Sequence, residues 1–178
     1  VKLARWFDER FEPLEKRRTY ARLSRRQSAT PDIPRPSWHL EEAARAGRTF
    51  GVLLDTSGSM DRSLLAAALG AIASYSAARD VSRVRVVFCD AAPYDQGYME
   101  AADIAGSVKV RGRGGTVLQP GVELLEHAPD FPREAPLLLI TDCECDRLNL
   151  YGRDHAFLVP RGRSLPFPPK GPVFYLEP

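Results

Sequence analysis

Cysteine and long apolar segments are both scarce in this sequence. Its 178 residues contain three cysteines, an odd number without the spacing of a disulfide framework, which is typical of a protein from a reducing compartment. The longest apolar run, residues 64–73, is much shorter than the roughly 20 residues of a membrane-spanning helix, and no signal-peptide pattern opens the chain. We therefore expect a cytoplasmic protein with no membrane partner.

Familiar catalytic motifs are also missing. The segment 55–58, Asp-Thr-Ser-Gly, differs from the Asp-Thr-Gly of aspartic proteases by an inserted serine and has no second copy. An aspartyl-phosphate enzyme would have a second aspartate where Ser57 stands, and the glycine-rich stretch 111–116 lacks the lysine of a Walker loop. Neither His-Glu-x-x-His nor a Ser-His-Asp set can be assembled. The sequence therefore contains no recognisable catalytic machinery.

Neither sign of charge is in large excess, but positive and negative residues are unevenly distributed along the chain. The net charge is +2, with 12 Lys or Arg against 7 Asp or Glu in residues 1–50 and 13 against 16 in residues 51–178. A basic N-terminal arm of this kind could contact nucleic acid or an acidic partner, or could be a solvated surface paired with the acidic body. Because aromatic and basic residues do not alternate as in RNA-binding segments, we expect no nucleic-acid partner.

Alternating strand and helix patterns predict an α/β fold. With 44% apolar residues, the chain can bury one sizeable core. The patterns predict helices over residues 3–21, 62–79 and 120–127, and strands over 49–55, 83–89, 97–103, 137–141, 156–159 and 173–176. This order predicts a mostly parallel central sheet with helices on both faces in residues 48–178, preceded by a helical and Pro-rich extension in residues 1–47. The bend over residues 145–154 is too short for a full helix, so we expect the sheet to be less covered there, or covered by the N-terminal segment.

Hydroxyls and carboxylates gather in three loops near predicted strand and helix ends. The first loop starts at the end of the strand 49–55 and contains Asp55, Ser57 and Ser59. In the second, Thr116 follows a Gly-Gly turn, and in the third, Asp142 follows the strand 137–141. Ligands of open parallel sheets gather beyond the carboxyl ends of the strands, so Asp55 and Asp142 can meet in space. Hydroxyls with few carboxylates suit Mg²⁺, which prefers oxygen ligands and keeps several waters. The sequence therefore predicts a metal site with open positions.

Plainer roles are available for the same residues. A serine at the helix cap with Asp61 in the first turn would stabilise the helix 62–79 whether or not metal binds. The Gly-Gly pair before Thr116 could be a simple tight turn. Cys143 and Cys145 form a Cys-x-Cys pair that could bind a soft metal, but the three histidines are scattered and no second pair exists, so small apolar residues are the favoured interpretation.

The three loops together resemble the metal-ion-dependent adhesion site of von Willebrand factor A domains. Asp-x-Ser-x-Ser at 55–59, Gly-Gly-Thr at 114–116 and Thr-Asp at 141–142 occur in the matching order and structural context. The resemblance implies a Rossmann-like fold and a Mg²⁺ ion, or Mn²⁺ or Ca²⁺ in its place. It implies that three hydroxyls bind the ion and two carboxylates bind it directly or through water; the residues are Ser57, Ser59, Thr116, Asp55 and Asp142.

The sequence before the first strand resembles one particular group of von Willebrand A-like domains. Ser-Arg-Arg-Gln at 24–27 and Pro-Asp-Ile-Pro-Arg-Pro at 31–36 are similar to the lead-in to the von Willebrand A-like domain of bacterial predicted metal-dependent peptidases, in which a zinc-peptidase domain comes first. That domain is absent from this chain, which starts at Val1, so we expect a fragment of a longer protein. Val117 departs from the pattern, because an acidic residue is expected after the Gly-Gly-Thr turn.

The function implied by the resemblance is metal-gated protein recognition. An ion held by hydroxyls and water-bridged carboxylates keeps enough positive charge to accept an Asp or Glu side chain from a partner protein. The resemblance also implies a chaperone-like ATPase as a partner. Two alternatives stay open: the chain is the non-catalytic part of a metal-dependent peptidase or hydrolase, or it is a structural module whose metal site has decayed.

Overall fold

A six-stranded sheet forms the centre of the computed structural model, which describes residues 2–15, 17–23, 36–39, 47–107 and 115–176. The strand order is β5-β4-β3-β6-β7-β8, and every neighbouring pair is parallel except the antiparallel pair β4 and β5. The six strands are β3 (Gly51–Asp55), β4 (Arg83–Cys89), β5 (Pro93–Glu100), β6 (Leu137–Ile140), β7 (His155–Pro160) and β8 (Val173–Leu176). This topology confirms the predicted mostly parallel, Rossmann-like α/β fold.

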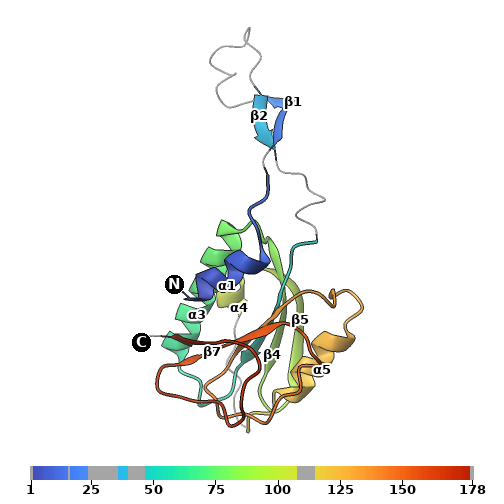
Figure 1. The fold of residues 1–178 in the computed structure, drawn as a ribbon. Coiled ribbons are helices and arrows are strands. Elements are labelled where there is room, and N and C mark those ends of the chain that lie inside the picture. The colour runs from blue at the N-terminus through green and yellow to red at the C-terminus, as the bar shows by residue number, and fades with distance from the viewer. Residues whose placement is uncertain (1, 16, 24–35, 40–46, 108–114, 177–178) are drawn as a thin grey trace.

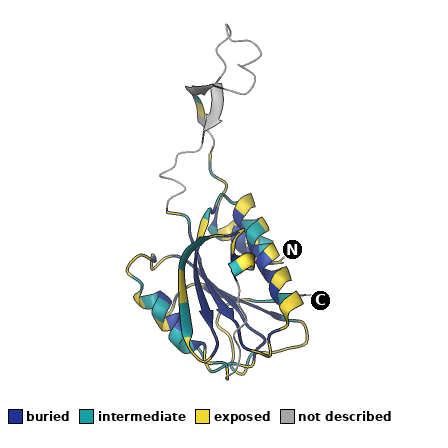
Figure 2. Cartoon of the chain, turned by 180° about the vertical axis from the view of Figure 1, so that it is seen from behind, coloured by how far each residue is buried: buried dark blue, intermediate teal, exposed yellow. Residues whose placement is uncertain are grey.

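The central strands are apolar because both of their faces are covered. All residues of β3 and β6 are buried. Successive side chains point to opposite faces of a strand, so Val52 and Leu54 join one core cluster while Leu53 joins the other. Figure 2 shows the buried strands between helices whose outer surfaces are exposed.

Helices cover both faces of the sheet. On one face, α3 (Arg62–Ala78) buries residues at helical spacing, among them Leu65, Leu69 and Ile72. On the other face, α5 (Gln119–His127) lies over β3, β4 and β5 (Figure 1). None of the helices in the described part of the chain is long and apolar enough to cross a membrane.

Helix α5 approaches the sheet closely because of one glycine. A Cβ atom on Gly121 would lie 2.5 Å from Cδ1 of Leu53 and 3.3 Å from Sγ of Cys89. Only a residue without a side chain allows this contact. The glycine therefore sets the height of α5, and of the loop before it, above the ends of β3 and β4.

The N-terminal segment differs from its prediction. The helix expected over residues 3–21 ends at Arg10, where α1 (Lys2–Arg10) stops, because Pro13 disfavours helical geometry in the residue before it. The chain continues as β1 (Arg17–Leu23), which pairs antiparallel with β2 (Pro36–His39) in a separate two-stranded sheet. In Figure 1 this hairpin extends away from the rest of the domain. The lead-in motifs at residues 24–27 and 31–35, and Gly114, lie outside the described residues.

Helix α1 packs onto one face of the sheet and contributes to its core. Phe7 has no exposed surface and lies with its ring centroid 5.0 Å from that of Phe50 and 5.5 Å from that of Tyr75 on α3. Arg10 binds Asp154, which immediately precedes β7, through a 2.7 Å hydrogen bond from Nη2 to Oδ1. The N-terminal helix therefore covers the α3 face, and it leaves the α5 face of β7 to loops.

A second difference lies at the edge of the sheet. The strand predicted over residues 97–103 is β5 (Pro93–Glu100), which begins earlier because it pairs with β4 from Cys89↔Pro93 to Arg83↔Glu100. Beyond it, the chain forms the short helix α4 (Ile104–Ser107), whose Ile104 is buried on the α3 face. Backbone pairing, which local sequence does not reveal, decides where this strand starts.

The order of the strands creates a crevice between β3 and β6. From β3 the chain moves outward to β4 and β5 and then returns to β6 on the other side of β3. At such a reversal the connections leave in opposite directions, so a crevice opens beyond the carboxyl ends of the two strands. Asp55 ends β3, and Thr141 and Asp142 directly follow β6, so all three lie at this crevice.

Candidate metal site

Asp55 joins the ends of the two central strands. Its side chain is fully buried, with Oδ1 accepting the Ser57 backbone N–H at 2.9 Å and Oδ2 accepting the Thr141 hydroxyl at 2.9 Å. Burial raises the pKa of Asp55, hydrogen bonds from Ser57 and Thr141 oppose that rise, and the neighbouring charge of Asp142 adds to it. Two carboxylates that are distant in sequence therefore influence each other in this crevice.

Asp142 has an unsatisfied oxygen. The side chain is buried, and its Oδ1 accepts the Glu144 backbone N–H at 3.0 Å. Its Oδ2 is also buried but has no hydrogen-bond partner among the described residues. A buried carboxylate oxygen without a partner is costly, and an oxygen-seeking cation is one group that would satisfy it. Cys143, in a left-handed conformation with φ of 74°, turns the chain directly after this residue.

Ser57 and Ser59 provide a pair of neighbouring hydroxyls. Their Oγ atoms lie 3.1 Å apart, and Ser57 is buried. The suggestion that a serine caps the following helix is wrong, because the cap of α3 is Asp61, whose carboxylate accepts the N–H groups of Ser63 at 2.7 Å and Leu64 at 3.3 Å. The two serines therefore precede the helix and leave their hydroxyls at the crevice.

Thr116 is half-buried in the loop before α5, and its neighbour anchors that loop to β4. The backbone N–H of Val117 donates to the Asp90 carbonyl at 2.9 Å, and Sγ of Cys89 contacts the Val117 carbonyl at 3.1 Å. The Cys89 carbonyl also accepts the backbone N–H of Thr56 at 2.8 Å. The end of β4 thus contacts both hydroxyl-bearing loops. In the described part of the chain, no hydrogen bond connects Thr116 to the other four predicted site residues.

Asp146 connects the loop after β6 to the loop before α5. Its Oδ1 accepts the Leu118 backbone N–H at 2.7 Å, and its Oδ2 accepts that of Gln119 at 3.3 Å, so it caps α5 from a remote position. The sequence around the Cys-x-Cys pair does not by itself predict this capping role for Asp146. A usable signal was present, because α5 starts after Leu118, which has no capping side chain of its own.

Removing this cap is expected to loosen the site without removing a predicted ligand. Asp146→Ala should lower the free energy of unfolding by about 1 kcal/mol, the usual cost of a lost N-cap. It should also weaken Mg²⁺ binding by about 10-fold if Thr116 binds the ion, because the loop before α5 loses its support. Urea denaturation and calorimetric titration measure the two effects. Asp146→Asn should recover part of both, and the exposed Glu134→Ala should change neither.

The cysteines are poorly suited to bind a metal here. Burial raises the pKa of Cys89 and of Cys145 to about 12 and that of Cys143 to about 11, so the thiols stay protonated at neutral pH. Among the described residues, no three His, Cys, Asp or Glu side chains form a cluster that could hold a metal ion. Any metal in this crevice would depend on hydroxyls and on the pair Asp55 and Asp142.

Comparisons with known proteins agree with this fold. A family profile described as VWA-like domain (DUF2201) matches residues 50–150, which include all five predicted ligands. Among solved structures, the chain is similar to an aerotolerance-related membrane protein from Bacteroides fragilis NCTC 9343 with multiple mutations to serines. The TM-score is 0.50 at 15% identity, over 68% of this chain and 73% of that one, a likeness of fold alone. No curated protein matches the chain. Because the family profile spans more than half of its residues, the chain belongs to the family of VWA-like domains (DUF2201).

Proposed function

We propose that this domain recognises a partner protein through a divalent metal ion, Mg²⁺ or Mn²⁺ or Ca²⁺, bound at the crevice between β3 and β6. The single observation that supports it best is the buried, partnerless Oδ2 of Asp142 beside a second buried carboxylate, Asp55. A cation between them would offset their repulsion and the cost of their burial. Ser57, Ser59 and Thr116 would supply neutral oxygen ligands.

The chemistry of the five side chains favours recognition over catalysis. Two carboxylates balance a divalent ion, and three hydroxyls add no charge. Where water separates a carboxylate from the ion, the neutralisation is incomplete, and an Asp or Glu from a partner can enter the open coordination position. The exposed Val117, with 41% of its surface accessible, lies directly after Thr116 and would contact whatever binds there.

Manganese offers a direct test, because bound Mn²⁺ relaxes the protons of its own water ligands. We expect the protein to bind Mn²⁺ and enhance water-proton relaxation, and we expect N-acetylglutamate amide to lower that enhancement by displacing water. N-acetylglutamine amide, which has no carboxylate, should not. No Mn²⁺ binding would refute the metal site. Binding that the carboxylate cannot alter would refute the recognition step alone.

The wider setting of the module is a further part of the proposal. The similarity of residues 24–36 to the lead-in of predicted metal-dependent peptidases supports a role as the non-catalytic part of such a protein, with a chaperone-like ATPase as its partner. The free thiols of Cys89, Cys143 and Cys145 suit a cytoplasmic setting. Peptidase activity that appears only when an upstream zinc-binding domain is present would support this role.

A further inference from the structure

A cavity of about 530 Å³ lies on the α5 face of β7, apart from the crevice between β3 and β6. Its floor is apolar: Phe157 of β7 and Phe167 pack edge to face with their ring centroids 6.0 Å apart, and Leu150 is buried beside them in the same cluster. The volume falls in the range of small-molecule sites, which is about 300 to 1,000 Å³. The cavity is therefore large enough for an organic ligand.

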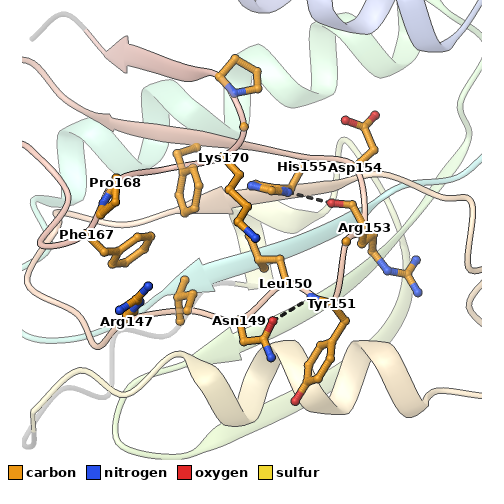
Figure 3. A pocket seen from close by; sticks show the side chains of 15 residues that line it. Arg147, Asn149, Leu150, Tyr151, Arg153, Asp154, His155, Phe167, Pro168 and Lys170 are labelled. Atoms are coloured by element: carbon orange, nitrogen blue, oxygen red, sulfur yellow. Dashed lines mark hydrogen bonds between the residues drawn. The ribbon is translucent and has the colours of Figure 1, made fainter.

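The cavity exists because two connections in this part of the fold lack helices. Parallel strands are usually joined by a helix that covers the sheet. Here residues 141–154, between β6 and β7, and residues 161–172, between β7 and β8, are both irregular. These two loops form the walls, and Figure 3 shows side chains from both of them around one hollow. The expectation that the sheet is less covered near residues 145–154 agrees with this arrangement.

The loop between β7 and β8 packs tightly against the start of β7. A Cβ atom on Gly171 would lie 2.3 Å from the carbonyl oxygen of His155 and 2.9 Å from its Nε2. The His155 ring is held by its Nδ1, which donates to the Arg153 carbonyl at 2.7 Å. This end of the cavity is consequently a closed wall, not a gap between loose loops.

Two cations at the cavity have no counter-charge within the described part of the chain. Arg153 is neutralised by Glu126, and Asp154 is neutralised by Arg10. Arg147 and Lys170 also line the cavity, and neither forms an ion pair with any residue in the described ranges. Figure 3 shows the Lys170 side chain pointing into the hollow, toward Leu150. The lining therefore combines an apolar floor with two positively charged side chains.

We propose that this cavity binds a small organic anion, with its apolar body against Phe167 and its charged group beside Arg147 and Lys170. The apolar floor provides area that gains free energy when water leaves it. The two unpaired cations attract a carboxylate, sulfonate or phosphate group, and Arg147 can form two parallel hydrogen bonds to such a group. The site needs no divalent metal, so it does not depend on the function proposed above.

Two dyes that share one ring system provide the test. 1-Anilinonaphthalene-8-sulfonate is an aromatic anion, and N-phenyl-1-naphthylamine is the same molecule without the sulfonate. We expect saturable binding of one sulfonated dye per chain, measured by fluorescence titration and equilibrium dialysis, with the same affinity in EDTA and in Mg²⁺. Arg147→Met and Lys170→Met should each weaken it about fivefold, as expected for a partly exposed ion pair, and leave the uncharged dye unaffected. Phe167→Ala should weaken both dyes.

Controls separate this site from general dye adsorption. Arg62→Met removes an exposed arginine from α3, across the sheet, and should leave both affinities unchanged. Near-ultraviolet circular dichroism and the thermal midpoint should match those of the wild type for each variant, because the sulfonated dye also binds loosened cores. Equal dye affinity in wild type, Arg147→Met and Lys170→Met would overturn the proposal, as would binding that does not saturate.

Discussion

Asp142→Asn is expected to abolish the stabilisation of this domain by Mg²⁺ without destabilising the metal-free protein. The substitution keeps the shape of the side chain and the Oδ1 acceptor for the Glu144 N–H, but it replaces the partnerless Oδ2 with an amide nitrogen that cannot bind a cation. Metal affinity should fall by about 100-fold or more, since the loss of an outer partner alone costs about 10- to 100-fold. Calorimetric titration with Mg²⁺ measures this loss directly.

The stability of the metal-free variant distinguishes a ligand from a structural carboxylate. Asp142 raises the pKa of Asp55, so removing its charge relieves repulsion, and the metal-free thermal midpoint should stay equal or rise. Saturating Mg²⁺ should raise the midpoint of the wild type by mass action but not that of the variant. Asp103→Asn, an exposed aspartate before α4, is the matched control and should behave as wild type. An equal Mg²⁺-induced rise in Asp142→Asn would refute the assignment.

Phe7→Ala is expected to cause the largest loss of stability. The Phe7 side chain is fully buried and packs against Phe50 and Tyr75 through ring contacts. Truncating such a phenylalanine removes its burial and leaves a cavity, at a cost of about 3 to 5 kcal/mol. Urea denaturation should show a lower midpoint with an unchanged slope, since the fold itself is retained.

The control for Phe7 comes from the same N-terminal segment. Tyr20 on β1 is 70% exposed, so Tyr20→Ala should change the free energy of unfolding by less than about 0.5 kcal/mol. A loss below about 1 kcal/mol in Phe7→Ala would mean that α1 contributes little to the domain. The comparison therefore measures whether the N-terminal helix is integral to the fold.

Much of the sheet could be predicted because its strands are strongly apolar. The runs at 50–54 and 137–140 are buried on both faces, and this composition itself indicates central strands of a parallel sheet. The helix expected over 62–79 matches α3 to within one residue, since its apolar spacing is a local feature. Apolar spacing alone predicts too long an N-terminal helix, because it takes no account of Pro13, and the pairing of β1 with β2 leaves no local pattern.

The candidate site likewise has features that the sequence predicts and features that depend on tertiary contacts. Its carboxylates and hydroxyls could be found from the sequence, because each stands beside an element with a clear local pattern. The hydrogen bond from Thr141 to Asp55 and the remote cap of α5 by Asp146 could not be found in this way. Both join residues from different loops, so they depend on which strands are neighbours. The orphaned Oδ2 of Asp142 is likewise a property of packing.

By itself, the sequence determined which segments form the central strands of the sheet, which residues follow them, and that the chemistry of those residues suits an oxygen-seeking cation. Only the tertiary structure decided that β3 and β6 are neighbours, that α1 covers one face of the sheet, and that two helix-free connections leave a cavity on the other. The physical reason is that local patterns reflect burial and backbone preference, whereas neighbours in space are set by strand pairing and by the competition of elements for the same apolar surface.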